Sequence, residues 1–159
     1  MGIQEAARAE SFALLIDLGT KLQVLVDRHL APSGFTTRQW FLCLVLEQAG
    51  RSLSLRETAL RMGTSHQNAK QLALKLERKG YLRIERDPED ARALRLSLTE
   101  ACRAFWARRK DRDREILEAV FRGLPAPDLD ALHRALKRLD LDVHTLLADD
   151  SLPFLKEKS

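Results

Sequence analysis

The spacing of apolar residues changes abruptly at Gly80, and this change constrains the fold more than any other feature of the sequence. Before Gly80, apolar residues recur every three or four positions, which is typical of an amphipathic helix. After it they alternate with charged or small polar residues, at positions 82, 84, 94, 96 and 98. Alternation is the pattern of a strand with one buried face, so the sequence predicts helices followed by two strands.

The helices before Gly80 have clear boundaries. Ser54 and Glu57 form a Ser-x-x-Glu capping box, which predicts a short helix over residues 55–62. A glycine turn follows, and Thr64 or Ser65 then caps a second helix to about residue 79. Between the strands, residues 87–92 form a polar turn, so the strands should pair as a hairpin. Helix, turn, helix and hairpin together make a winged helix-turn-helix.

Long helices flank this segment. We expect one over residues 6–30, a second from an N-cap at Thr37 to about residue 49, and a third over residues 100–122. The last begins near Leu129, and its apolar residues are spaced like a coiled-coil seam, at Leu132, Leu136, Leu139, Val143 and Leu146. The predicted fold is therefore mainly α with a small β-hairpin. Residues 1–34 and 100–159 would be dimerisation helices around a DNA-binding domain over residues 35–99.

Charge is concentrated in the middle of the chain. The net charge is +4, but residues 51–95 carry eleven Lys and Arg against six Asp and Glu. A basic segment between nearly neutral arms is expected of a protein that binds a polyanion. The first ten residues do not resemble a secretory signal, and no apolar run could span a bilayer, so we expect a cytoplasmic protein.

The helix over residues 65–79 is the candidate recognition helix. Its apolar residues fall on one face, and the opposite face can hydrogen-bond to base edges or phosphates in a major groove. The candidate contacts on this helix are Ser65, His66, Gln67, Lys70, Gln71 and Lys75. In the hairpin, Arg92 is the candidate for insertion into the minor groove, Arg86 flanks it, and Asp90 would orient Arg92 or brace the turn. The alternatives are a merely solvated polar face and a surface ion pair at Arg92.

Several ordered motifs resemble the MarR family of regulators. They are Arg38-Gln39-Trp40, residues 53–59, 64–68 and 76–82, the wing motif over residues 86–92, and Leu96-Ser97-Leu98-Thr99-Glu100. The resemblance implies a homodimer, a palindromic operator in double-stranded DNA, and repression relieved by a small ligand or an oxidant. His66 departs from the arginine common in the family, and Ala101-Cys102 replaces a common lysine and glycine.

A small-molecule pocket is a further expectation, because MarR-like proteins commonly hold an aromatic or carboxylate ligand where arm and winged helix join. The candidate pocket residues are Phe12, His29, Phe35 and Trp40, with Phe41 nearby. The alternative is that these are ordinary core aromatics, which is the commoner role of such residues.

The two cysteines and four histidines suggest no metal site, cofactor or disulfide framework. Cys43 lies in an apolar run and is expected to be buried and inert, whereas Cys102 lies near a helix N-terminus and is the better redox candidate. Nothing in the sequence marks a resolving partner for it. Without a nucleotide-binding or hydrolase motif we expect no enzyme, and the main rival is a winged-helix module that binds protein and not DNA.

Overall fold

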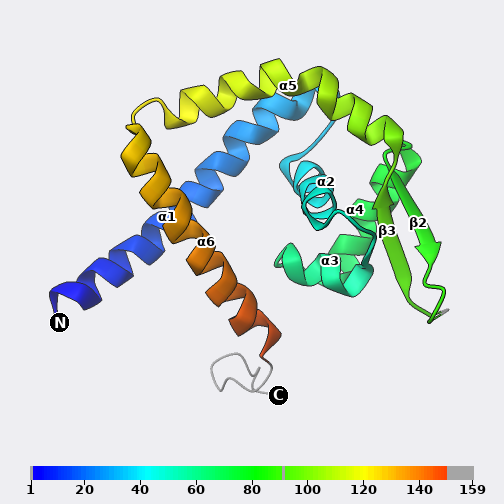
Figure 1. Cartoon of the computed structure of the whole chain (residues 1–159), viewed down its shortest axis with the longest axis horizontal. Coiled ribbons are helices and arrows are strands. Elements are labelled where there is room, and N and C mark those ends of the chain that lie inside the picture. The colour runs from blue at the N-terminus through cyan, green and yellow to red at the C-terminus, as the bar shows by residue number, and fades with distance from the viewer. Residues whose placement is uncertain (1, 91, 150–159) are drawn as a thin grey trace. The chain divides into compact units, whose positions relative to one another are not determined.

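The structure is a computed structural model that describes residues 2–90 and 92–149 (Figure 1). The chain divides into two compact units, the first ending at Phe41 and the second beginning at Leu42. Helix α1 (Ile3–Leu30), a 3-10 turn η1 (Ala31–Ser33) and the start of α2 (Thr37–Ala49) belong to the first unit. The rest of α2 and all later elements belong to the second.

In the first unit, the end of α1 determines where α2 begins. The backbone N–H of Thr37 donates to Asp27 Oδ1 over 2.6 Å, and the Thr37 hydroxyl donates to the carbonyl of Gln23 over 3.1 Å. The N-cap of α2 is Thr36, which exchanges hydrogen bonds with Gln39 in a capping box, each 3.3 Å long. The prediction of Thr37 as the cap was wrong by one residue, because either threonine suits the position and only the backbone direction distinguishes them.

The second unit contains the helix pair predicted around the glycine turn. Helix α3 (Leu55–Arg61) begins with the predicted capping box of Ser54 and Glu57, and α4 (His66–Arg78) begins at an N-cap on Ser65. Gly63 lies between the helices with φ of 59°. A residue with a β-carbon rarely adopts this left-handed conformation, so glycine allows the sharp change of direction.

A three-stranded antiparallel sheet follows, in the order β1-β3-β2. Strands β2 (Leu82–Arg86) and β3 (Leu94–Leu98) form the predicted hairpin, with Ile84 opposite Leu96. Strand β1 (Leu53–Ser54) pairs with β3 and was not predicted, since two residues are too few to show alternation. Leu53, Leu76, Leu82 and Leu96 are almost fully buried and form part of the core between helices and sheet.

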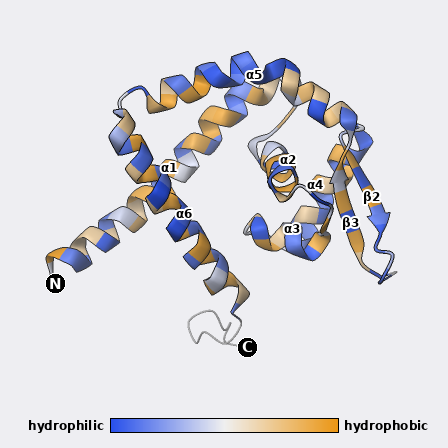
Figure 2. Cartoon of the chain, viewed as in Figure 1, coloured by the Kyte–Doolittle hydropathy of each residue, from blue (hydrophilic) through white to orange (hydrophobic). Residues whose placement is uncertain are grey.

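Helices α5 (Glu100–Phe121) and α6 (Ala126–Ala148) complete the described chain. Helix α6 begins three residues earlier than predicted, because Pro127 lies in its first turn, where proline needs no hydrogen-bond partner for its nitrogen. Figure 2 shows apolar residues recurring along α1 and α6. The exposed members on α6 include the whole predicted seam, namely Leu132, Leu136, Leu139, Val143 and Leu146. No helix in the described ranges is long and apolar enough to cross a membrane.

Candidate nucleic-acid interface

Helix α4 has one buried face and one exposed face, as its sequence predicts. Ala69, Ala73 and Leu76 have no exposed surface, which anchors the helix against the domain core. All six candidate contact residues are exposed, namely Ser65, His66, Gln67, Lys70, Gln71 and Lys75. The exposed face carries two positive charges and several groups that can donate or accept hydrogen bonds, which suits contact with base edges and phosphates.

The C-terminal end of α4 is tied to β2 and to Thr99, the residue that follows β3. Gly80 ends the helix with φ of 76°, and the backbone N–H of Ile84 on β2 donates to Glu77 Oε1 over 3.2 Å. From the other side, the Thr99 hydroxyl donates to the carbonyl of Gly80 over 2.7 Å, and its N–H donates to the carbonyl of Tyr81. These contacts hold helix and hairpin in one relative orientation, which two-groove recognition requires.

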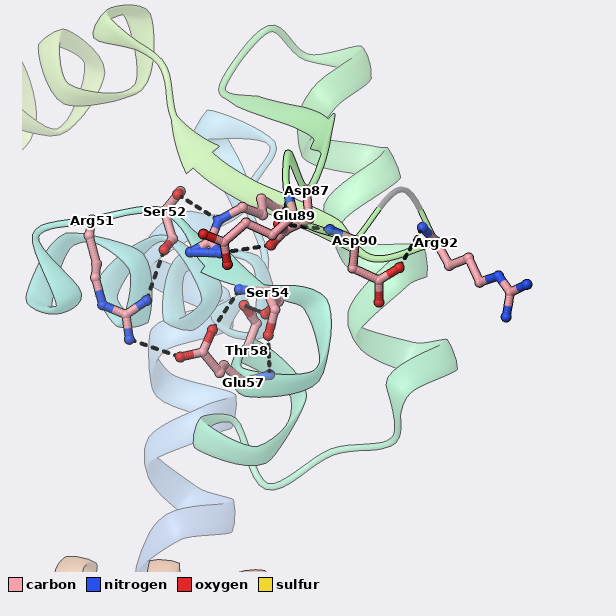
Figure 3. Close-up of polar contacts among 10 residues, drawn as sticks. Arg51, Ser52, Ser54, Glu57, Thr58, Asp87, Glu89, Asp90 and Arg92 are labelled. Atoms are coloured by element: carbon pink, nitrogen blue, oxygen red, sulfur yellow. Dashed lines mark hydrogen bonds and ion pairs between the residues drawn. The ribbon is translucent and has the colours of Figure 1, made fainter.

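The tip of the hairpin is shaped by two aspartates (Figure 3). Asp87 Oδ1 accepts hydrogen bonds from the backbone N–H groups of Glu89 (2.9 Å) and Asp90 (3.4 Å). Asp90 Oδ1 in turn accepts the N–H of Arg92 over 2.9 Å. Asp90 was predicted either to orient the Arg92 guanidinium or to brace the turn, and this hydrogen bond braces the backbone of the turn. The tip is therefore preformed by side chains that mimic turns, and little conformational entropy would be lost on binding there.

Arg92 projects from this tip away from the other labelled residues (Figure 3). It is exposed, and no acid among the described residues lies within ion-pair distance of its guanidinium. The surface ion pair considered as an alternative for Arg92 is thus not formed within the described ranges. Arg86 is also exposed, at the end of β2. Both side chains are available to an external anion.

Below the tip, Arg95 makes an ion pair that was not predicted from the sequence. Its Nη1 lies 2.9 Å from Asp87 Oδ2, and its Nε donates to Ser52 Oγ over 3.1 Å. The side chains of Asp87 and Arg95 are only 13% and 31% exposed. The N–H of Glu89, more than the Arg95 guanidinium, lowers the pKa of Asp87. Arg95 therefore connects the wing tip to the segment that precedes α3.

A polar hollow of about 440 Å³ lies at this base of the wing. It is lined by Ser52, Glu85, Arg86, Asp87, Pro88, Glu89 and Arg95. Both signs of charge line it, and the Asp87–Arg95 pair already neutralises one of its two arginines. The hollow is therefore a feature of the hairpin, and its lining does not favour one class of ligand.

At the start of α3, Glu57 forms a second charged contact. Its Oε2 accepts the N–H of Ser54 over 2.8 Å in the capping box, and its Oε1 pairs with Arg51 Nη2, also at 2.8 Å. The hydrogen bond from Arg51, followed by that from Ser54, lowers the pKa of Glu57 to about 2. The carboxylate thus remains charged under all physiological conditions and stabilises the first helix of the pair.

The four candidate pocket residues lie in the first unit. Phe12 is 69% exposed on α1 and Phe35 is 3% exposed, while His29 and Trp40 are half-buried. Phe12 and His29 both belong to α1, and a rise of about 1.5 Å per residue separates them by about 25 Å along its axis. One small ligand could contact both only if Phe12 came from a second copy of the chain.

Comparison with known proteins agrees with this geometry. The model of the MarR family matches residues 33–93, which span α2, α3, α4 and β2 and end just before β3. The winged-helix domain is a MarR-family domain. Among curated proteins no sequence match is found.

Three solved structures illustrate the likeness. A MarR-family transcriptional regulator from Rhodococcus sp. RHA1 has a TM-score of 0.74 at 21% identity, covering 84% of this chain and 94% of that chain. A mutant MarR from E. coli, complexed with operator DNA, has a TM-score of 0.69 at 17% identity, with 80% and 91% covered. CouR from Rhodococcus jostii RHA1, bound to p-coumaroyl-CoA, has a TM-score of 0.69 at 20% identity, with 80% and 88% covered.

These findings confirm the predicted fold class, a winged helix-turn-helix flanked by long helices. The match to the family model relates residues 33–93 to the MarR family of transcription regulators.

Proposed function

We propose that this MarR-family regulator acts as a homodimer on a palindromic operator, with α4 in the major groove and the wing in the minor groove. Two observations carry the proposal: α4 has an exposed polar face, and Arg92 is exposed and forms no ion pair with residues 2–90 or 92–149. Ser65, His66, Gln67 and Lys70 lie nearest the N-terminus of α4, the end of a recognition helix that usually contacts bases. Lys75 and Gln71 lie further along and suit phosphate contacts.

The wing would contribute positive charge and a preference for DNA with a narrow minor groove. A narrow minor groove concentrates negative potential, and a planar, exposed guanidinium such as that of Arg92 fits it. The Oδ1 of Asp90 accepts the backbone N–H of Arg92 and thereby braces the turn that presents this guanidinium. Arg86 would approach the flanking phosphates.

The arms would supply the dimer. Phe12, Leu18 and Leu25 on α1 are between 42% and 69% exposed, and the α6 seam residues are between 36% and 51% exposed. A continuous exposed apolar row of this length marks an interaction surface. Twofold pairing of the arms would place two α4 helices about one helical turn of DNA apart. Residues 1–34 and 100–159 would thus serve dimerisation, around a DNA-binding domain of residues 35–99.

We further propose that the dimer represses transcription and is released by a small aromatic or carboxylate ligand. The support is the aromatic character of Phe12, Phe35 and Trp40 and the bound p-coumaroyl-CoA in the CouR neighbour. The length of α1 between Phe12 and His29 favours a site completed by the second copy. A panel of phenolic acids tests this proposal: binders should raise the thermal midpoint and weaken operator binding, and a flat response across the panel would contradict it.

Selection of bound sequences from random duplexes is the most direct test of the operator. An enriched palindrome with half-sites about ten base pairs apart would support the dimer and the role of α4 together. Affinity for the selected duplex should fall steeply with salt, and Arg92→Ala should weaken it roughly tenfold. Arg114→Ala, on the exposed charged part of α5, is the matched control. Failure of any duplex to bind at low salt would favour the protein-interaction alternative.

A further inference from the structure

The second unit brings its two cysteines into contact at its core. Cys43 on α2 and Cys102 on α5 are 59 residues apart in sequence, yet their sulfur atoms lie 3.8 Å apart. Cys43 is 3% exposed and Cys102 is fully buried. The sequence marks no resolving partner near Cys102, and the structure brings Cys43 against it from a distant helix. We propose that Cys43 and Cys102 form an oxidisable dithiol, that a hydroperoxide converts it into an intrachain disulfide, and that the disulfide weakens DNA binding.

The two sulfur atoms need to move only a short distance to form a disulfide bond. A disulfide has a sulfur–sulfur length near 2.05 Å, so the two atoms must approach by roughly 1.8 Å from their 3.8 Å separation. The whole sequence contains only these two cysteines, so an intrachain disulfide has one possible pairing.

The surroundings favour Cys102 as the attacking thiol. It lies in the first turn of α5, where its N–H donates to the N-cap hydroxyl of Thr99 over 3.2 Å. The hydrogen bond shared with Cys43 lowers the pKa of Cys102, and burial opposes this effect. The Trp106 side chain and Arg103 lower the pKa further, while Glu47 raises it. Cys43 retains its proton, because the same contact and burial raise its pKa. An attacking thiolate beside a protonated resolving thiol is the arrangement that disulfide formation requires.

The reaction is balanced with hydrogen peroxide as the oxidant. The Cys102 thiolate attacks one peroxide oxygen, the O–O bond breaks, and the departing hydroxide takes up a proton to become water. Cys102 is then a sulfenic acid. The Cys43 sulfur attacks the Cys102 sulfur, the S–S bond forms, the S–O bond breaks, and a second water leaves with the Cys43 proton. One peroxide and two thiols thus give one disulfide and two waters.

The dithiol is linked to the DNA-binding surface through the start of α5. Thr99, three residues before Cys102, donates its hydroxyl to the carbonyl of Gly80 and its N–H to the carbonyl of Tyr81. Gly80 is the residue that turns the chain from α4 into the wing. A disulfide that draws the first turn of α5 towards α2 would therefore change the orientation of α4 relative to the wing, which two-groove binding requires.

The test uses the reduced full-length protein, hydrogen peroxide and the selected duplex. Intact mass should fall by two hydrogen atoms per chain, peptide mapping should find Cys43 joined to Cys102, and dithiothreitol should reverse both changes. Because the thiols are buried, mild denaturant should accelerate the reaction. Cys43→Ala should stop at a sulfenic acid trapped by dimedone, and Cys102→Ala should lose neither hydrogen nor thiol. The oxidised protein should bind the duplex about tenfold more weakly.

Three results would overturn the proposal, and none of them needs a variant. Unchanged mass of the wild-type chain at peroxide levels that oxidise a free dithiol would contradict the oxidation, as would a disulfide that joins two chains. An intrachain disulfide with unchanged duplex affinity would overturn the coupling to DNA. That coupling rests on the proposed function, whereas the mass measurement does not. If the reduced protein bound no duplex, the proposed function would fail and the dithiol would still be decided by mass.

Discussion

The winged helix and the flanking arms both expose residues that invite a partner, but the residues differ in kind. Helix α4 buries alanine and leucine and exposes histidine, glutamine and lysine, so its outward face already has favourable hydration. The α6 seam and α1 expose leucine, valine and phenylalanine, which water does not stabilise. This difference indicates that the outward face of α4 can remain hydrated and exposed in the absence of DNA. The apolar surfaces of the arms are expected to be paired permanently.

The largest expected effect comes from placing a charge in the arm. Leu136→Asp or Leu139→Asp should weaken the dimer by about 3 kcal/mol, roughly a hundredfold in dissociation constant, because pairing would bury an unpaired carboxylate. Sedimentation measures the change. Leu141→Asp is the control, since Leu141 is 66% exposed but lies off the seam. Equal dissociation by the control and the seam variants would contradict the proposed interface.

A second comparison separates base reading from phosphate binding within α4. Gln67→Ala should cost about 2 kcal/mol on the selected duplex and relax base preference, since an amide can pair with a base edge. Lys75→Ala should weaken all duplexes alike and lower the salt dependence by about one phosphate contact. Binding titrations on matched and mutated half-sites at several salt concentrations distinguish the two. If both variants changed base preference and salt dependence in the same way, the proposed division of α4 into base-reading and phosphate-binding residues would be contradicted.

The wing brace gives a smaller effect. Arg95→Ala removes the contacts to Asp87 and Ser52 and should weaken duplex binding by about 1.5 kcal/mol through a less ordered wing tip. The fold should persist, as circular dichroism would show. Arg83→Ala is a suitable control, because Arg83 lies on the same hairpin and its side chain is 66% exposed. Its one ion-pair contact among the described residues, with Glu85, is long at 4.0 Å. A larger loss of duplex affinity with Arg83→Ala than with Arg95→Ala would mean that the positive charge of the hairpin, and not the order of its tip, determines how strongly the wing binds DNA.

The smallest effect concerns pH. The pKa of Glu57 is lowered to about 2 in the folded protein, so its contribution to stability is present above its ordinary value of 4.5 and is lost as pH falls through about 2. Since the Glu57 side chain is 39% exposed, we expect about 1 kcal/mol after allowance for solvent screening. Urea unfolding between pH 7 and pH 2 should show less acid destabilisation in Glu57→Gln than in the wild type. Equal pH dependence of the two proteins would show that Arg51 and Ser54 do not stabilise the charge.

Much of the winged helix could be predicted because its signals are local. The capping box at Ser54, the glycines at 63 and 80 and the alternation after Gly80 each act within a few residues. The outward residues of α4 followed from helical period alone, and the structure confirms that each is exposed. The role of each in binding DNA remains a prediction.

The contacts that were missed join residues far apart in the chain. Strand β1 could not be recognised from the sequence because it depends on pairing with β3. The Ser52–Arg95 contact beside this pairing joins residues that are 43 positions apart. The Asp87–Arg95 pair could have been suspected from opposite charges at the two sides of a hairpin, but many such charges are solvated and unpaired. The cysteine pair carried no local signal at all.

The sequence by itself determined the order of helices and strands, their caps and turns, and which face of each is apolar, because periodicity and backbone preference operate over one or two turns. Only the tertiary structure decided that Cys43 meets Cys102 and that Arg95 connects Ser52 with Asp87. Those contacts depend on the way whole elements pack against a shared core, and packing of this kind leaves no repeat in the chain from which it could be recognised.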